Sequence, residues 1–440
     1  MSKYMVDSSD LTSVANAIRS KAGTDAPLEF PDEFVSTVNN LSVMKDYDSE
    51  FVFKLTAATL TVNLYLTQSS PNAVTVNWGD GSTTETSSDL SAEFTHTYAS
   101  AETYGVKISC ADGETWCPGG KLNSVDYCLL GVANTFYSTL ISAVFGKNTN
   151  LNNTKCMAYC NRMTWIRISK HVTIIGTDAF VNCSNLAEVH IDDLNAWLNI
   201  TFQNRNGAPL YIGHYLYLND ELATDIAYPS SITTVTNNIF AGCYNLRNLT
   251  LQGQVTYIGA SAFSGCRNLA DFIIPNTVTT IGSGAFQGCT SLANLVIPDS
   301  VTRIDSYAFT NCSNVTNLTI SNSLTGIDNS VFSGLFKLTT VVVPPSVTYI
   351  GANSFDNCTG LTSLTFLSTQ LRGLATSALA NCTSLMSITC YAINPPNMTG
   401  NPLQNVPANC NIYVPAQSVE AYKQAQYWSD RADYIQAIPS

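Results

Sequence analysis

The chain has 440 residues, of which 45% are hydrophobic and only 12% are charged, and its formal net charge is −12. This hydrophobic share favours a folded protein over a disordered one. The acidic balance, with no basic run, argues against a duplex-binding protein, because phosphate contacts need clustered lysine and arginine. No apolar window of about 18 residues occurs, so we expect no insertion into a membrane.

Residues 1–42 contain two short apolar stripes at helical spacing, which predict a pair of helices too small to fold alone. Such a pair is suited to docking on another protein. The order of residues in 6–21 and 28–36 resembles an N-terminal module of tail proteins from phages and prophages of gut bacteria. The resemblance implies attachment to other tail or baseplate proteins. The first ten residues hold no apolar leader, so we expect the chain to fold in a cytosol.

Residues 47–116 contain several short runs that are apolar or alternate apolar and polar, separated by turn residues, which predicts β-strands. Asp80, followed by glycine directly after Trp78, indicates a tight turn. With His96 and the run 104–108, these residues resemble the PKD domain, an immunoglobulin-like sandwich. The resemblance implies a spacer or adhesion module with Trp78 in its core. Asp80 could contribute to a calcium site, but calcium takes six or more oxygen ligands and one carboxylate is not a site.

Six phenylalanines recur every 23 residues between 240 and 355, which predicts a solenoid of stacked, near-identical turns. Cysteine or leucine stands three positions after each ring, and leucines follow at the spacing seen in 292–297. Over residues 118–390 this repeated sequence pattern resembles the BspA-like leucine-rich repeats of bacterial surface proteins. We expect the repeated rings and thiols to form continuous internal columns. Their members are Phe180, Phe240, Phe263, Phe286, Phe309, Phe332, Phe355, Cys183, Cys243, Cys266, Cys289, Cys312, Cys358 and Cys382.

The predicted fold class is therefore mainly β: a leucine-rich-repeat solenoid preceded by an immunoglobulin-like sandwich and a short helical module. Most of the 14 cysteines share one repeat position, which predicts buried free thiols acting as small hydrophobic side chains. A metal site is the alternative, but Cys156 and Cys160 have no matching second pair. The state of Cys110, Cys117 and Cys128 stays open. We expect no cofactor.

Residues 192–228 interrupt the period between Phe180 and Phe240, which predicts one excursion that enters and leaves the coil at the same edge. The segment is rich in aromatic residues, which concentrate at recognition surfaces. Some of these rings would instead form a small core of the segment's own. The candidate binding residues in it are Trp197, Phe202, Tyr211, His214, Tyr215 and Tyr217.

Short neutral polar residues alternate with the buried positions of the repeat strand, so they would face an open sheet. They could bind a glycan or an elongated protein, or they could simply be solvated. The candidates are Asn294, Asn317, Thr319, Thr340 and Thr365. After the repeats, residues 391–440 resemble the closing segment of BspA-like proteins. We expect Tyr422, Trp428 and Tyr434 to cover the last turn.

No catalytic constellation stands out, because the four histidines lack metal or triad spacing and no nucleophile-elbow or phosphate-loop motif occurs. We therefore expect a protein that is not an enzyme. The leading hypothesis is a phage or prophage tail-tip or fibre protein, located in the virion, that contacts a host glycan or protein through its solenoid. The alternative is a BspA-like adhesin at the bacterial cell surface. A homo-oligomer is compatible with both.

Overall fold

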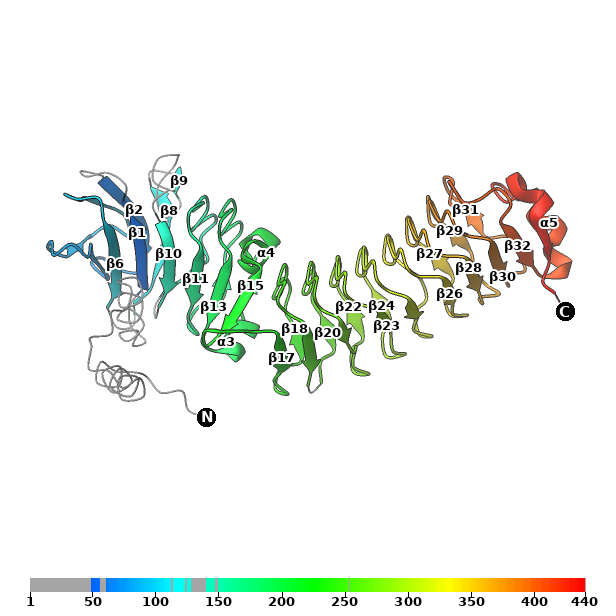
Figure 1. Cartoon of the computed structure of the whole chain (residues 1–440), viewed down its shortest axis with the longest axis horizontal. Coiled ribbons are helices and arrows are strands. Elements are labelled where there is room, and N and C mark those ends of the chain that lie inside the picture. Colours follow the sequence, from blue (N-terminus) through cyan, green and yellow to red (C-terminus); the bar gives the residue numbers. More distant parts are fainter. Residues whose placement is uncertain are drawn as a thin grey trace, which may run out of the picture.

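The computed structural model describes residues 49–55, 61–111, 114–122, 125–127, 140–146, 149–252 and 254–439. The predicted module at 1–42 and Cys128 lie outside these residues. The described residues form an elongated, curved molecule, with a two-sheet unit at one end and a long coil of stacked turns leading to the C-terminus (Figure 1).

The strands between residues 49 and 118 lie in two antiparallel sheets. β1, β6, β3 and β4 are neighbours in one sheet, and β5, β2 and β7 are neighbours in the other. Strand β2 alternates half-buried and buried residues along its length, as expected where one face packs on a core. The strand bounds are β1 (Ser49–Lys54), β2 (Thr61–Gln68), β3 (Val74–Asn77), β4 (Glu85–Thr86), β5 (Ser91–Thr97), β6 (Thr103–Cys110) and β7 (Trp116–Pro118).

The turn after β3 is fixed by side chains that pack on Trp78, which is fully buried. The His96 ring stacks on Trp78 with centroids 5.0 Å apart. The Asp80 carboxylate accepts a hydrogen bond from the Ser82 amide at 3.0 Å and lies 2.6 Å from Nε2 of His96. Hydrogen bonds from Ser82, together with His96, lower the pKa of Asp80 to about 2. Asp80 therefore anchors a turn, and within the described ranges no cluster of three or more metal-ligating side chains occurs.

From residue 140 onward the chain winds into a coil in which most strands run parallel to the strand one turn earlier. Asn294 pairs with Asn317 and Leu295 with Leu318, so the register advances by the predicted 23 residues. The predicted mainly β solenoid is confirmed. The strands on one side are β10 (Leu140–Phe145), β11 (Trp165–Ile168), β13 (Glu188–Ile191), β15 (Tyr215–Leu218), β17 (Asp225–Tyr228), β19 (Asn248–Leu251), β21 (Asp271–Phe272), β23 (Asn294–Val296), β25 (Asn317–Thr319), β26 (Thr340–Val343), β28 (Ser363–Phe366), β30 (Ser387–Cys390) and β32 (Asn411–Val414).

Shorter paired strands form the second side of the coil. They lie in sheets ordered β12-β14, β18-β20-β22-β24 and β27-β29-β31. Their bounds are β12 (Ile174–Ile175), β14 (Thr201–Phe202), β18 (Thr234–Val235), β20 (Tyr257–Ile258), β22 (Thr280–Ile281), β24 (Arg303–Ile304), β27 (Tyr349–Ile350), β29 (Gly373–Leu374) and β31 (Asn397–Met398). A separate hairpin joins β8 (Gly120–Leu122) to β9 (Val125–Tyr127).

The repeated rings and thiols lie inside the coil. Every phenylalanine and cysteine of the two predicted columns is fully buried. Phe263 stacks on Phe286 with centroids 5.2 Å apart, and Phe286 on Phe309 at 5.3 Å. These distances are close to the roughly 4.8 Å between paired strands, so the stacking follows directly from the period.

The position before each column cysteine requires a left-handed backbone. Its φ is 77° at Gly265, 75° at Gly288, 60° at Asn311 and 58° at Asn357. Glycine and asparagine tolerate this region best, which is why the words Gly-Cys and Asn-Cys recur in the sequence. The turn that brings the thiol inward is thus encoded locally in every repeat.

Residues 192–218 do not form the predicted side excursion but wind into one further, longer turn of the coil. β15 pairs in parallel with β13, and Leu218 faces Ile191, 27 positions earlier. β14 pairs with β12 on the second side. The extra length is taken up by α3 (Leu194–Leu198), η1 (Arg205–Gly207) and α4 (Leu210–Gly213). The chain turns back only after β15, where β16 (Glu221–Leu222) pairs antiparallel with it.

The two-sheet unit and the coil share one continuous sheet. β1 pairs antiparallel with β10, the first strand of the coil, and with β6 on its other edge. A nine-stranded sheet results, in the order β16-β15-β13-β11-β10-β1-β6-β3-β4. The join is reinforced by Ser49, whose Oγ lies 2.5 Å from Oγ1 of Thr149 and accepts from the amide of Gly146 at 2.8 Å. Backbone pairing therefore fixes the orientation of the two parts.

The C-terminal segment closes the far end of the coil (Figure 1). After β32 the chain forms η2 (Ala416–Ser418), α5 (Val419–Gln424) and η3 (Ser429–Tyr434) and ends in β33 (Ile435–Ala437), parallel to β32. Tyr422 and Trp428 are buried, and they donate to the carbonyls of Ala392 and Pro396 at 2.9 and 3.1 Å. Tyr434 is 37% exposed and is thus far less buried than these two residues, so its part in covering the last turn stays a prediction.

Candidate functional site

One side of the repeat strands faces solvent along the coil. In β23, Leu295 is buried while Asn294 and Val296 on either side of it are exposed. Asn294, Asn317, Thr319 and Thr340 are exposed on this face, and Thr365 is half-buried. The side chain of Asn317 donates to Asn294 at 2.8 Å, so part of the polar row is bonded to itself.

The open face is less polar than the sequence analysis expected. Ile273, Val296 and Val342 are 84%, 59% and 51% exposed. Val296 pairs with Thr319, which places apolar and hydroxyl side chains in one row. Single exposed apolar residues need no explanation, so this part of the face does not by itself mark a site.

Aromatic residues gather on the open face at β11, β13 and β15. The register places Trp165, Glu188 and Tyr215 in one row, and Arg167, His190 and Tyr217 in the next. The rings of His190 and Tyr217 stack at 4.6 Å and 7°, and Trp165 meets His190 edge-on at 5.6 Å. Tyr215 is 43% exposed. We call these six residues the aromatic face.

The charged groups of the aromatic face pair with one another. The Arg167 guanidinium, which is buried, bonds to Asp192 and to Asp220. The ring nitrogens of His190 lie 3.0 Å from Asp220 and 3.2 Å from Glu188. Burial opposes ionisation of Asp220, but Arg167 and His190 outweigh it and lower the pKa of that carboxyl. The network holds Arg167 and His190 in fixed positions and leaves the partly exposed Glu188 carboxylate in the same row as the exposed Tyr215 ring.

The other predicted aromatic residues of 192–218 lie elsewhere. Trp197 and Phe202 are buried and contact each other with centroids 5.6 Å apart, so as binding residues they were predicted wrongly. They fill the interior of the longer turn, which has more space to close than a 23-residue turn. Tyr211 and His214 are half-buried and lie in and directly after α4, apart from the strand rows that form the aromatic face.

Sequence reasoning missed four members of the aromatic face, Trp165, Arg167, Glu188 and His190. A signal was present, because each pair alternates with buried residues within one strand, as in Trp165-Ile166-Arg167. These residues could be aligned with Tyr215 and Tyr217 on the neighbouring strand only by treating 192–218 as a turn of the coil. Reading it as an excursion separated Tyr215 and Tyr217 from the strands that they join.

No helix in the described ranges is both long and apolar enough to cross a bilayer. The same ranges contain no cluster of acidic, histidine and cysteine side chains suited to a metal ion. The aromatic face itself presents rings, carboxylates and a buried guanidinium on an open sheet.

Several solved structures are similar to this chain. A leucine-rich cell surface protein from Faecalibacterium prausnitzii is 22% identical, with 62% of this chain and 94% of that chain covered and a TM-score of 0.31. A leucine-rich repeat protein from Bacteroides ovatus is 20% identical over 73% and 91% of the two chains, with a TM-score of 0.32. The pneumococcal vaccine antigen PcpA is 16% identical over 63% and 68%, with a TM-score of 0.40.

None of the curated proteins matches the chain in sequence. The profile of the BspA type leucine rich repeat region does match, in six copies that cover residues 133–208, 150–293, 210–335 and 279–395. These ranges span most of the coil and more than half of the chain. The 23-residue register, the internal columns and this match lead to one conclusion: the chain belongs to the BspA type leucine-rich repeat family.

Proposed function

We propose that this protein is a non-enzymatic, adhesin-like recognition protein whose aromatic face binds a glycan on a cell surface. The observation that carries the proposal is the placement of Trp165 and Tyr215 in one row on either side of Glu188, on an open sheet. Aromatic rings offer the flat apolar contact that sugar rings use, and carboxylates accept hydrogen bonds from sugar hydroxyls.

Rigidity of the surface supports recognition. The aromatic face lies on the nine-stranded sheet, and its rings are held by stacking and by the Arg167 network. A preorganised surface loses little conformational entropy on binding, which favours affinity from a modest contact area. The chain belongs to the BspA type family. Because the repeats of this family resemble those of bacterial surface proteins, membership favours a location at the cell surface.

Attachment to a phage tail stays a hypothesis. It rests on the resemblance of residues 1–42 to a module of tail proteins, and these residues lie outside the described ones. The PKD resemblance of 47–116 likewise supports only a spacer role within this proposal. Deleting residues 1–42 separates the two locations. Loss of incorporation into phage particles would favour the virion, and an unchanged particle composition would count against it.

The function is tested by binding of the full chain to a printed array of mammalian and bacterial glycans. We expect Trp165→Ala and Tyr215→Ala to weaken binding at least about tenfold, since hot-spot aromatic side chains contribute more than about 1.4 kcal/mol each. Thr340→Ala and Val342→Ala, on the same open face but many turns away, are the matched controls and should bind as the wild type does.

Two results would refute the proposal: absence of binding to every glycan, or unchanged binding by both aromatic variants. Binding to cells that disappears after protease treatment, while the glycan array stays negative, would assign the surface to a protein partner instead. In each case the thermal unfolding midpoints of the variants must match the wild type, so that a loss of binding reports on the surface.

A further inference from the structure

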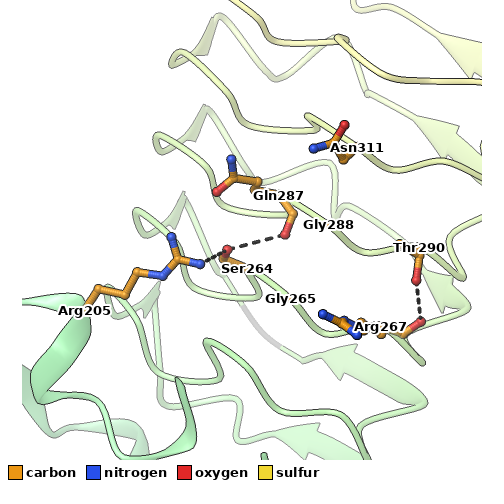
Figure 2. Close-up of a pocket in the computed structure, with 8 residues that line it drawn as sticks. All are labelled: Arg205, Ser264, Gly265, Arg267, Gln287, Gly288, Thr290 and Asn311. Atoms are coloured by element: carbon orange, nitrogen blue, oxygen red, sulfur yellow. Dashed lines mark hydrogen bonds between the residues drawn. The ribbon is translucent and has the colours of Figure 1, made fainter. Parts of the chain in front are cut away.

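A recess lies in the turns that lead from the second side of the coil into the repeat strands. It is broadly open to solvent, has a volume of about 390 Å³ and spans three successive turns, at 264–267, 287–290 and 311. This volume falls within the range of about 300–1,000 Å³ typical of small-molecule sites. Figure 2 shows Arg205 reaching into it from the helical part of the long turn, with Arg267 farther along its floor.

Within the described part of the chain, no carboxylate forms an ion pair with Arg205. Its guanidinium donates to Oγ of Ser264 at 3.0 Å and lies 4.3 Å from the ring centroid of Tyr211. Its Nε atom is buried and has no hydrogen-bond partner among the residues that the structure describes. Among the described residues that line the recess, none is acidic. Arg205 therefore brings to the recess a positive charge that no lining carboxylate offsets.

Arg267 is held by a separate stack of rings. Its guanidinium lies 4.8 Å from the centroid of Tyr244, whose ring stacks on His214 at 4.0 Å and 6°. Nδ1 of His214 lies 3.2 Å from the carbonyl oxygen of Gly242. Burial, with Arg267 nearby, lowers the pKa of His214, so at neutral pH the arginines supply the positive charge.

The long turn, residues 192–218, therefore positions both arginines at the recess. Arg205 and Tyr211 belong to it directly, and His214 supports Arg267 through Tyr244. The candidate residues Tyr211 and His214 thus act as supports for the recess. Neither arginine could be assigned from the sequence, because 62 positions separate them and only the 27-residue turn brings them to one surface.

The floor and far wall of the recess offer neutral hydrogen-bonding groups. Gln287 and Asn311 present side-chain amides, and Thr290 presents a hydroxyl. Gly265 and Gly288 lie between these groups, and at Gly288 a Cβ would have its nearest neighbour at 3.9 Å, so the floor is open backbone. Arginine recognises planar oxyanions through paired N–H donors, and amides suit hydroxyl groups.

We propose that this recess binds an acidic saccharide, with its carboxylate or sulfate between Arg205 and Arg267 and its hydroxyls on Gln287 and Asn311. A free oxyanion would leave most of the volume unfilled, whereas a sugar ring occupies it. The protein carries a net charge of −12, so long-range attraction would not concentrate anions here, and the selectivity comes from the two arginines. The site uses none of the aromatic face and stands independently of the function proposed above.

The experiment is calorimetric titration of the full chain with two acidic probes, tetragalacturonate and a heparin-derived tetrasaccharide. Cellotetraose is the neutral control and sodium sulfate the free-anion control. We expect at least one acidic probe to bind, and Arg267→Gln and Arg205→Gln each to weaken it at least about tenfold, the loss of one charge-assisted contact. Arg303→Gln, an exposed arginine paired with Asp305, should bind as the wild type does.

Arg205 also packs on Tyr211, so its variant could loosen the long turn. Arg267 is exposed, so Arg267→Gln should leave the thermal unfolding midpoint unchanged. A loss of binding in this variant therefore reports on the recess and not on stability. Equal binding of acidic and neutral probes, or unchanged affinity in Arg267→Gln, would overturn the proposal. So would sulfate binding as tightly as the tetrasaccharides, because the recess would then hold a simple anion. Trp165→Ala should leave this binding intact, which separates it from the aromatic face.

Discussion

The thiol of Cys289 donates a hydrogen bond to the backbone carbonyl of Phe263, one turn earlier, at 3.2 Å. The same carbonyl accepts from the amide of Cys266 at 3.0 Å. Equivalent thiol contacts of 3.1 to 3.3 Å are made by Cys266, Cys312, Cys358 and Cys382. The sequence analysis treated these cysteines only as small hydrophobic side chains. In the structure each thiol also donates a hydrogen bond, which a small apolar residue such as alanine could not do.

Replacing Cys289 by alanine is expected to destabilise the coil by about 1–2 kcal/mol, from a small cavity and a lost weak hydrogen bond. The effect should be local, because each turn contacts mainly its neighbours. Amide hydrogen exchange should quicken in the turns around Cys289 and stay unchanged in the two-sheet unit. Cys110→Ala, at a half-buried thiol outside the column, is the control. Equal effects of the two variants would contradict a special role for the column.

The column thiols are expected to be unreactive in the folded protein. Burial raises the pKa of Cys312 and of Cys382 to about 12. At pH 8 both groups are protonated, so a thiol reagent such as dithionitrobenzoate should label them only after unfolding, since the thiolate is the nucleophile. Fast labelling of the native protein at these positions would show that the column opens.

The same shifts predict a loss of stability in alkali. The folded state holds these thiol protons more tightly than the unfolded chain, in which the thiol pKa is near its ordinary value of 9.0. The stabilisation is therefore complete below about pH 9 and is lost as the pH rises toward 12, by about 1.4 kcal/mol per pH unit for each thiol. Unfolding midpoints measured from pH 7 to 11 check this. Cys312→Ala should flatten the decline, and an equally steep curve would argue against it.

Two glycines at the same repeat position give a matched pair. Gly265 and Gly242 have φ values of 77° and 83°. A Cβ on Gly265 would come no nearer than 3.6 Å to another atom, whereas on Gly242 it would lie 2.5 Å from the carbonyl oxygen of Leu210. Gly265→Ala should therefore cost only the left-handed backbone strain, about 1–2 kcal/mol. Gly242→Ala should cost clearly more, because α4 must move.

Thermal unfolding of the two glycine variants measures the difference. Gly265→Asn is the control and should be nearly neutral, since asparagine occupies this position in other turns, as at Asn357. If both alanine variants lose the same stability, backbone strain alone accounts for the destabilisation. The close approach of α4 to Gly242 would then make no contribution.

Glu50 lies on β1 where the two-sheet unit meets the coil, opposite both Lys107 and Val144. Burial raises the pKa of Glu50, with Lys107 opposing the shift. The folded state then binds this proton more tightly, so the contribution to stability is greatest below the ordinary pKa of 4.5 and falls as the pH rises through the raised pKa. Glu50→Gln should flatten this part of the stability curve and be at least as stable at pH 7.

The exposed Glu102 supplies the control, because Glu102→Gln should leave the pH dependence unchanged. Unfolding midpoints between pH 4 and 7 report both variants. A Glu50→Gln protein that is less stable at neutral pH would show that the ionised carboxylate and its pairing with Lys107 stabilise the junction.

Much of the coil was predictable because its information is local and repeated. The 23-residue period predicted the internal Phe and Cys columns. The glycine or asparagine before each column cysteine was a further local signal, which the sequence analysis did not use. The exposed rows around Asn294 and Asn317 followed from alternation within a strand. The candidate site was found only in part, since Tyr215 and Tyr217 lie on the aromatic face while Trp197 and Phe202 lie in the core.

By itself the sequence determined that the chain stacks turns, which residues face inward, and where each turn bends, since these depend on neighbours a few positions apart or one period away. Only the tertiary structure decided that β10 pairs with β1, that 192–218 is a turn, and that Arg205 and Arg267 share a recess. These facts rest on strand register and on contacts between segments of unlike sequence. Backbone hydrogen bonding leaves no trace of its partner in the residues that form it, so only the folded chain reveals it.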